Sequence, residues 1–174
     1  MKNLTLLKAT VISGILTCVL ALTSCSKNDE QQQMIQKAVA IETADECHLC
    51  GMLITHFDGP KGELYRKNSL DPKTDSVKKF CSTRDMFSFY LEPENTRNVA
   101  IMYVHDMSKM PWGTINDEHF IDAKGAWYVS GSEKIGAMGK TLASFSKQID
   151  ATAFAEKFGG KVISFKEIDL SVLM

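Results

Sequence analysis

The sequence lacks the motifs of several common functional classes. It has no phosphate-binding glycine loop, no dinucleotide fingerprint and no basic patch, which argues against nucleotide and nucleic-acid binding. No Ser-His-Asp or paired-carboxylate arrangement stands out, so nothing favours a hydrolase. It has no second Cys-x-x-Cys, the usual companion pair of a structural zinc site. We therefore expect a binding protein rather than an enzyme.

The N-terminus has the pattern of a bacterial lipoprotein signal. Lys2 and Lys8 precede an uncharged, largely apolar run over residues 9–22, which is shorter than the roughly 20 residues that span a membrane. Leu22-Thr23-Ser24-Cys25 then matches a lipobox, with Cys25 as the residue that receives the acyl chains. Two or three chains would anchor the protein stably in the membrane. An ordinary secretory signal with a chance cysteine is the alternative.

The residues after Cys25 bear on where the protein is attached. Ser26 stands where an aspartate often retains lipoproteins in the inner membrane, so the outer membrane, on its periplasmic side, is favoured. The run 27–30 resembles acidic surface-export signals, which leaves the cell surface as an alternative. We predict a signal peptide over 1–24, a flexible tether over 25–38 and a folded domain over 39–174. Without residues 1–24 the chain has 18 basic and 21 acidic residues, a net charge of −3.

The most informative motif is Cys47-His48-Leu49-Cys50-Gly51-Met52, which we call the knuckle. Thiolate and thioether are soft donors that favour Cu(I). Cys50 and Met52 are the first candidate ligands and Cys47 is the third. Gly51 lets the backbone fold closely behind an ion.

Three other interpretations of the knuckle stay open. Cys47 and Cys50 could form a redox dithiol, a structural disulfide or half of a structural zinc site. Apart from the acylated Cys25, the mature chain keeps Cys47, Cys50 and Cys81, an odd number that argues against simple pairing. Cys81 is either a small buried hydrophobe or a neighbour of the knuckle, if its strand pairs with one that starts at Met52. The remaining, weaker donor candidates are His48, His56, Cys81, Met107 and Met110.

Hydrophobic patterns predict an α+β fold. We expect strands over 52–56, 99–104, 127–129 and 161–165, another that ends at Cys81, and a surface loop over 65–77. Helices are expected from a Ser82 cap to about Leu91, where Glu92-Pro93 stops the helix, and over 151–158. These elements fit two repeated β-β-α-β units, about 39–106 and 120–168. The repeat places Met138 opposite the knuckle and adds it as a candidate ligand.

The chain resembles the NosL family of copper-binding lipoproteins over residues 40–168. The resemblance rests on the knuckle after a lipobox, on residues 80–85 and 126–132, and on Met138-Gly139, Phe145 and Gly159-Gly160. It implies Cu(I) binding and a role in nitrous oxide reductase maturation, with the reductase or an ABC-type copper/sulfur maturation complex as partner. It also implies a fold related to organomercurial lyase.

The resulting hypothesis is a membrane-tethered Cu(I) chaperone without catalytic turnover. An accessible site with few ligands suits a protein that must release its metal to a partner. The alternatives are a periplasmic thiol–disulfide oxidoreductase that protects copper-site thiols, and a structural zinc lipoprotein module.

Overall fold

The computed structural model describes residues 37–67 and 77–174. The predicted signal peptide, Cys25 and nearly all of the predicted tether lie outside these residues, as does most of the loop predicted over 65–77. Within the described ranges, no helix is both long enough and apolar enough to cross a membrane.

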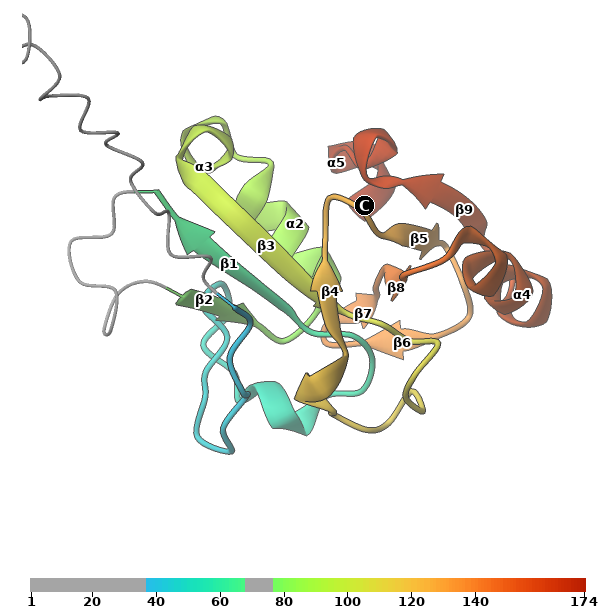
Figure 1. Cartoon of the computed structure of the whole chain (residues 1–174), viewed down its shortest axis with the longest axis horizontal. Coiled ribbons are helices and arrows are strands. Elements are labelled where there is room, and N and C mark those ends of the chain that lie inside the picture. The colour runs from blue at the N-terminus through green and yellow to red at the C-terminus, as the bar shows by residue number, and fades with distance from the viewer. Residues whose placement is uncertain (1–36, 68–76) are drawn as a thin grey trace, which may run out of the picture. The chain divides into compact units, whose positions relative to one another are not determined.

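The first half of the domain is a four-stranded antiparallel sheet in the order β2-β1-β3-β4, with helix α2 packed against β1 and β2 (Figure 1). The elements of this half are β1 (Gly62–Arg66), β2 (Val77–Phe80), α2 (Thr83–Tyr90), α3 (Pro93–Asn98), β3 (Val99–His105) and β4 (Phe120–Asp122), with short 3-10 helices η2 (Ile54–His56) and η3 (Asp117–His119).

The second half is a three-stranded antiparallel sheet in the order β8-β5-β9, covered by α4 (Figure 1). A two-stranded hairpin, β6–β7, lies between β5 and β8 in the chain. The elements are β5 (Trp127–Ser130), β6 (Ile135–Gly136), β7 (Gly139–Lys140), β8 (Ala143–Phe145), α4 (Gln148–Phe158), β9 (Lys161–Ser164), η4 (Phe165–Glu167) and α5 (Leu170–Leu173).

The two halves share a hydrophobic core. Phe87 on α2 lies with its ring centroid 5.3 Å from that of Tyr128 on β5 and 5.9 Å from that of Phe165. Phe87 and Tyr128 are fully buried, as are Leu64 and Met102 of the first sheet. Burial of a large apolar side chain contributes about 1.5–3 kcal/mol, so α2 ties both sheets together. A second cluster under α4 holds Met107, Met110, Val129, Ala143, Phe145 and Ala151.

The α+β class is confirmed, and so are most of the predicted elements. Ser82 caps α2, because its hydroxyl accepts a hydrogen bond from the Asp85 amide at 3.1 Å, and the helix ends at Tyr90 as expected. The strands at 99–104, 127–129 and 161–165 are present within a residue of their predicted ends, and α4 begins three residues early. The duplication and the kinship with organomercurial lyase stay predictions.

Two local predictions are wrong. The predicted strand over 52–56 is the 3-10 helix η2, and only an isolated bridge between Glu46 and Leu53 precedes it. The predicted loop at 65–77 loses its first two residues to β1. β2 pairs on one side with β1, a strand that was not predicted, and its other side is an edge of the sheet. There the His48 amide of the knuckle, and not residues 52–56, donates to the Lys79 carbonyl.

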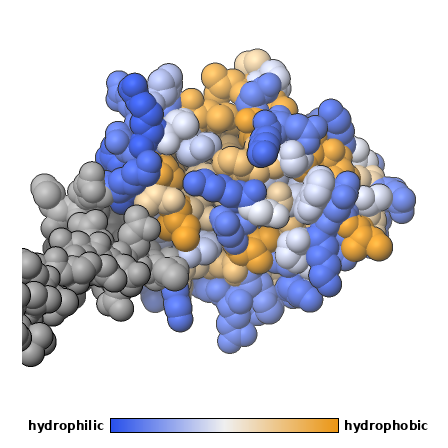
Figure 2. Space-filling model, turned by 45° about the horizontal axis from the view of Figure 1, so that its top comes forward, coloured by the Kyte–Doolittle hydropathy of each residue, from blue (hydrophilic) through white to orange (hydrophobic). Residues whose placement is uncertain are grey.

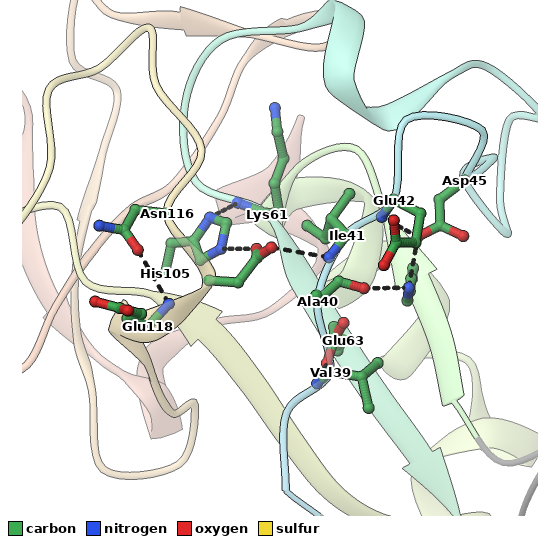
Figure 3. Close-up of polar contacts among 12 residues, drawn as sticks. Val39, Ala40, Ile41, Glu42, Asp45, Lys61, Glu63, His105, Asn116 and Glu118 are labelled. Atoms are coloured by element: carbon green, nitrogen blue, oxygen red, sulfur yellow. Dashed lines mark hydrogen bonds and ion pairs between the residues drawn. The ribbon is translucent and has the colours of Figure 1, made fainter.

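Residues 37–45, which we call the strap, lie along the first sheet without joining it as a strand. Side chains of the sheet and of η3 hold the strap's backbone (Figure 3). The Val39 amide donates to Glu63 Oε2 at 3.0 Å and the Ile41 amide to Asp117 Oδ2 at 2.9 Å. Lys79 Nζ donates to the Ala40 carbonyl at 2.6 Å. The start of the folded domain is thereby fixed against the first sheet, just before the knuckle in the chain.

Glu63 is the least satisfied member of this network. Its side chain is fully buried, and its Oε1 has no hydrogen-bond partner in the described part of the protein. Burial raises the pKa of Glu63 from 4.5 to about 7, against the opposing effects of the Val39 amide and Lys79. The folded protein therefore binds a proton more tightly here than the unfolded chain does.

The first prediction concerns stability against pH. Because the folded-state pKa of Glu63 is raised, proton binding at Glu63 stabilises the folded protein at low pH. This stabilisation is lost as pH rises from 4.5 to about 7. In Glu63→Gln this loss should vanish, so the variant should gain roughly 1–3 kcal/mol over the wild type across that window. Urea unfolding followed by circular dichroism at a series of pH values measures it. Glu118→Gln, an exposed site, is the control and should follow the wild type. Parallel curves for Glu63→Gln and wild type would contradict the assignment.

Candidate metal centre

The knuckle is a tight turn closed by its own backbone. The Cys47 amide donates to the Met52 carbonyl and the Gly51 amide to the Cys47 carbonyl, both at 2.8 Å. Gly51 has a φ of 73°, in the left-handed region that glycine enters without a Cβ penalty. The His48 amide donates to the Lys79 carbonyl at 2.8 Å, which attaches the turn to the end of β2. The knuckle is thereby held next to the residue where β2 gives way to α2.

Cys81 occupies that junction. It follows β2 directly, is fully buried, and lies one residue before the helix cap. Its Sγ lies 3.5 Å from Cys50 Sγ and 2.9 Å from Asp85 Oδ2, on the first turn of α2. Of the two interpretations of Cys81, the structure therefore shows the neighbour of the knuckle, although the expected strand pairing with Met52 is replaced by the single His48–Lys79 hydrogen bond.

Four side chains converge at this point. One ligand atom from each of Cys47, Cys50, Cys81 and Asp85 lies within 4.8 Å of all the others. Cys47 is 2% exposed and Asp85 6%, whereas Cys50 is half-buried. Three sulfurs and one carboxylate, all buried except for the half-buried Cys50, form a centre that a metal ion could reach from the side of Cys50. We call these four residues the thiol centre.

Asp85 is the member that sequence reasoning missed as a ligand. The pattern identified it only as a favourable acid in the first turn of a helix. The signal that could have found it is its spacing of four residues from Cys81 across the strand-to-helix junction. The structure brings the two side chains into contact there, with Cys81 just before the cap and Asp85 in the first turn of the helix.

The pKa values of the three thiols are shifted in different directions. Hydrogen bonding from Cys81 lowers the pKa of Cys47 from 9.0 to about 5, so Cys47 is a thiolate at neutral pH. The same hydrogen bond, burial and the nearby Asp85 carboxylate raise the pKa of Cys81, which stays protonated. Burial also raises the pKa of Cys50. These shifts favour the thiolate at Cys47 and the protonated thiol at Cys81 and Cys50.

A buried cation lies behind the thiol centre. Lys61 is fully buried, and its Nζ donates to the carbonyls of Phe57, Asp58 (3.3 Å) and Cys81 (3.2 Å). Burial lowers the pKa of Lys61 to about 8, and the charges of Asp58 and of the Cys47 thiolate oppose that shift. Lys61 thus remains mostly protonated at neutral pH and offsets negative charge that collects on the sulfurs.

The other two main candidate ligands, Met52 and Met138, lie on the knuckle turn and on the β6–β7 hairpin. Met52 is half-buried at the end of the knuckle turn. Met138 is 64% exposed at the tip of the β6–β7 hairpin, with a φ of 57°, and its carbonyl accepts from the Arg84 guanidinium at 3.5 Å. Arg84 immediately precedes Asp85, so the hairpin tip lies beside the start of α2. Binding by Met52 and Met138 stays a prediction.

The remaining weaker candidates lie apart from the four converging side chains. His48 packs edge-on against Phe89, with ring centroids 5.1 Å apart, and His56 is exposed at the end of η2. Met107 and Met110 are buried in the second core under α4, where they act as apolar filler.

The donor chemistry fits a soft monovalent metal. Three sulfurs are typical of Cu(I) sites and of zinc sites, and the carboxylate would complete a tetrahedral zinc set. The half-exposed Cys50 favours a centre that exchanges its metal over a closed structural one.

The second prediction tests the charge state of the metal-free centre. Thiolate ultraviolet absorbance should rise by one equivalent around pH 5, because hydrogen bonding lowers the pKa of Cys47. Cys81→Ala removes the donor and should move this step toward the ordinary thiol value of 9.0. Cys47→Ser should remove it altogether. A single rise near 9.0 in the unmodified protein would show that Cys47 is not the thiolate.

Comparison with known proteins agrees with this geometry. The family model described as NosL matches residues 38–173. The "Copper-binding lipoprotein NosL" of Stutzerimonas stutzeri is 46% identical over 164 residues, which cover 92% of this chain and 82% of that protein. The protein of the same name from Achromobacter cycloclastes is 31% identical over 88% of this chain and 78% of its own length. The crystal structure of the copper chaperone NosL from Shewanella denitrificans matches with a TM-score of 0.73 and 56% identity, over 78% of this chain and 97% of that one.

Proposed function

The chain belongs to the NosL family, and from this premise we propose that it is a lipid-anchored chaperone that binds Cu(I) and delivers it for the copper sites of nitrous oxide reductase. The observation that carries the proposal is the thiol centre, in which Cys47, Cys50, Cys81 and Asp85 converge within 4.8 Å. Two relatives that cover most of the chain are named for copper binding, which supports copper as the metal.

The charges of the centre favour a monovalent ion. Cys47 supplies one thiolate before metal arrives, so Cu(I) at that sulfur gives a neutral pair without the release of a further proton. Cys50 and Met52 then supply soft donors from the same turn, and Cys81 from the helix start. The hard carboxylate of Asp85 accepts from the Cys81 thiol at 2.9 Å, which suits it to orient that sulfur.

Delivery requires that a partner's ligand reaches the ion. Cys50 is the half-buried thiol of the set, and Leu49 beside it is 44% exposed, so the knuckle is the approach route. Hydrophobic residues also lie in patches between hydrophilic ones on the face shown in Figure 2. A lipid on Cys25 would hold donor and acceptor at one membrane surface and raise their effective concentration. The proposed location is the periplasmic side of the outer membrane, and the proposed recipient is the reductase or an ABC-type maturation complex.

The family premise also supports the proposed duplication. The sheets β2-β1-β3 and β8-β5-β9 have the same order of second, first and last strand, with a helix before the last strand in each. Two β-β-α-β units of this kind are what an organomercurial lyase-like fold would contain.

The third prediction is the binding of one Cu(I) per protein. Titration of the reduced protein in the presence of a competing chelator measures it. The Cys47→Ser/Cys50→Ser/Met52→Leu variant should lose binding, because it removes three of the soft donors. Met107→Leu/Met110→Leu, in the second core, should bind as the wild type does. A stoichiometry near zero, or full Cu(I) binding by the triple variant, would refute the proposal.

Single variants separate the rival functions. Cys47→Ser should abolish thiol–disulfide exchange yet retain measurable Cu(I) affinity, whereas an oxidoreductase would lose its whole function. A structural zinc module predicts unfolding when a chelator removes the metal, since binding is then folding free energy. The extensive shared core around Phe87 predicts instead that the metal-free protein stays folded.

The fourth prediction concerns delivery in cells. With Cys50→Ser in place of the native gene product, nitrous oxide reductase should accumulate without its full copper content, because the exposed ligand of the donor is missing. Metal analysis of the purified reductase measures this, and Met110→Leu is the control allele. A reductase with full copper in the Cys50→Ser strain would exclude this delivery route.

A further inference from the structure

A pocket of about 200 Å³ lies beside the start of α2. It is built where four elements meet: α2, the end of β5, the β7–β8 connection and α5. Its lining comprises Arg84, Ser130, Gly131, Lys140, Thr141, Leu142, Val172, Leu173 and Met174. We call it the Arg84 pocket. Its volume is that of several water molecules, enough for one side chain.

The side chains that line the Arg84 pocket carry net positive charge. Arg84 and Lys140 both line it with no Asp or Glu, and the chain's last residue, Met174, adds its carboxylate to the same lining. Within the described residues neither cation forms an ion pair, and the one hydrogen bond of the Arg84 guanidinium is the long 3.5 Å contact with the Met138 carbonyl. Two cations that line one small pocket and form no ion pair within the described residues are suited to an incoming anion.

The rest of the lining selects among anions. Leu142, Val172 and Leu173 give apolar walls, and Leu142 and Leu173 are buried. The Thr141 hydroxyl is already engaged with Thr83 at 3.1 Å, and Ser130 Oγ donates to the Val172 carbonyl at 3.4 Å. Few free hydroxyls remain for a phosphate with its three acceptor oxygens. A carboxylate on a short aliphatic stem matches both the two cations and the apolar walls.

The pocket and the thiol centre both include residues from the first turn of α2. Arg84 lies between Thr83, which contacts Thr141 and the Leu142 carbonyl, and Asp85 of the thiol centre. Arg84 also holds the carbonyl of Met138 at the tip of the β6–β7 hairpin. A side chain seated in the pocket would therefore place its protein beside the start of α2 and the hairpin tip.

We propose that the Arg84 pocket receives an aspartate or glutamate side chain of the protein that takes the metal, which fixes that partner over the thiol centre. The partner's role rests on the proposed function, whereas the pocket's preference for a carboxylate does not. Arg84 and Lys140 are then specificity-determining residues that bind the partner and do not bind copper.

The first arm of the test needs no metal. The full-length protein in detergent is titrated with acetyl-Leu-Glu-Leu-amide and with the matched acetyl-Leu-Gln-Leu-amide, and binding is followed by NMR. The glutamate peptide should shift the Arg84 and Thr141 signals, and the glutamine peptide should not. Arg84→Gln and Lys140→Gln should each weaken binding by about tenfold, as expected for loss of a charge-assisted hydrogen bond. Lys124→Gln, an equal charge change on an exposed turn outside the pocket, should leave it unchanged.

The second arm measures the copper content of nitrous oxide reductase from cells with each allele. Arg84→Gln and Lys140→Gln should lower it while both proteins bind Cu(I) with wild-type stoichiometry, and Lys124→Gln should not lower it. Thermal unfolding of each variant controls for folding, and Lys140, at an exposed position, tests the pocket without disturbing the core.

The outcomes distinguish the two levels of proposal. Equal binding of the two peptides, or tighter binding of inorganic phosphate or of phosphatidylglycerol vesicles than of the glutamate peptide, overturns the carboxylate pocket. Peptide binding with normal reductase copper in both variants overturns the docking role. A reductase whose copper is unaffected by deletion of the whole gene refutes the proposed delivery function, and the peptide arm alone then decides the pocket.

Discussion

The buried ammonium of Lys61 is the interaction on which the arrangement of the centre depends. It joins the carbonyls of Phe57 and Asp58, which follow the knuckle, to the carbonyl of Cys81 at the strand-to-helix junction. A buried charge costs several kcal/mol unless it is paired and hydrogen-bonded, so the chain around Lys61 is constrained to supply those acceptors. Two segments more than twenty residues apart are thereby held together, and each brings cysteine sulfur to one place. The same ammonium offsets the negative charge that thiolates would accumulate. Lys61 therefore both holds the two segments together and balances the charge of the centre.

The strap extends this organisation toward the N-terminus. Its backbone is held by side chains of Glu63, Asp117 and Lys79, and Asp45 at its end forms an ion pair with Lys79. The Lys79 carbonyl in turn accepts from the knuckle amide of His48. A continuous set of hydrogen bonds thus runs from the start of the folded domain to the thiol centre.

The sequence predicted most of the regular structure because strong local signals specify it. The Ser82 cap and the apolar face of α2 are encoded within ten residues, and the β3 run Val99–Val104 is almost wholly apolar. β1 was not predicted, because the charged Lys61 and Glu63 around Gly62 have no strand-like apolar pattern, yet all three residues are buried. Local pattern cannot show that Lys61 finds three carbonyls or that Glu63 accepts from the strap. Both contacts are made by residues that the fold, and not the local sequence, brings near.

The same limit applies to the thiol centre, and it explains why the knuckle alone is an incomplete site. Six consecutive residues supply Cys47, Cys50 and Met52, so the sequence could indicate soft-metal chemistry. The other half of the set, Cys81 and Asp85, comes from the β2–α2 junction, and only the His48–Lys79 hydrogen bond and Lys61 bring it within reach. A centre assembled from a turn and a helix start has one buried side and one more exposed side. The buried side holds Cys81 at the β2–α2 junction and Asp85 in the first turn of α2, while the knuckle turn presents the half-buried Cys50. Ligand exchange at Cys50 can then proceed without unfolding of the core, which is the physical requirement for a protein that gives its metal away.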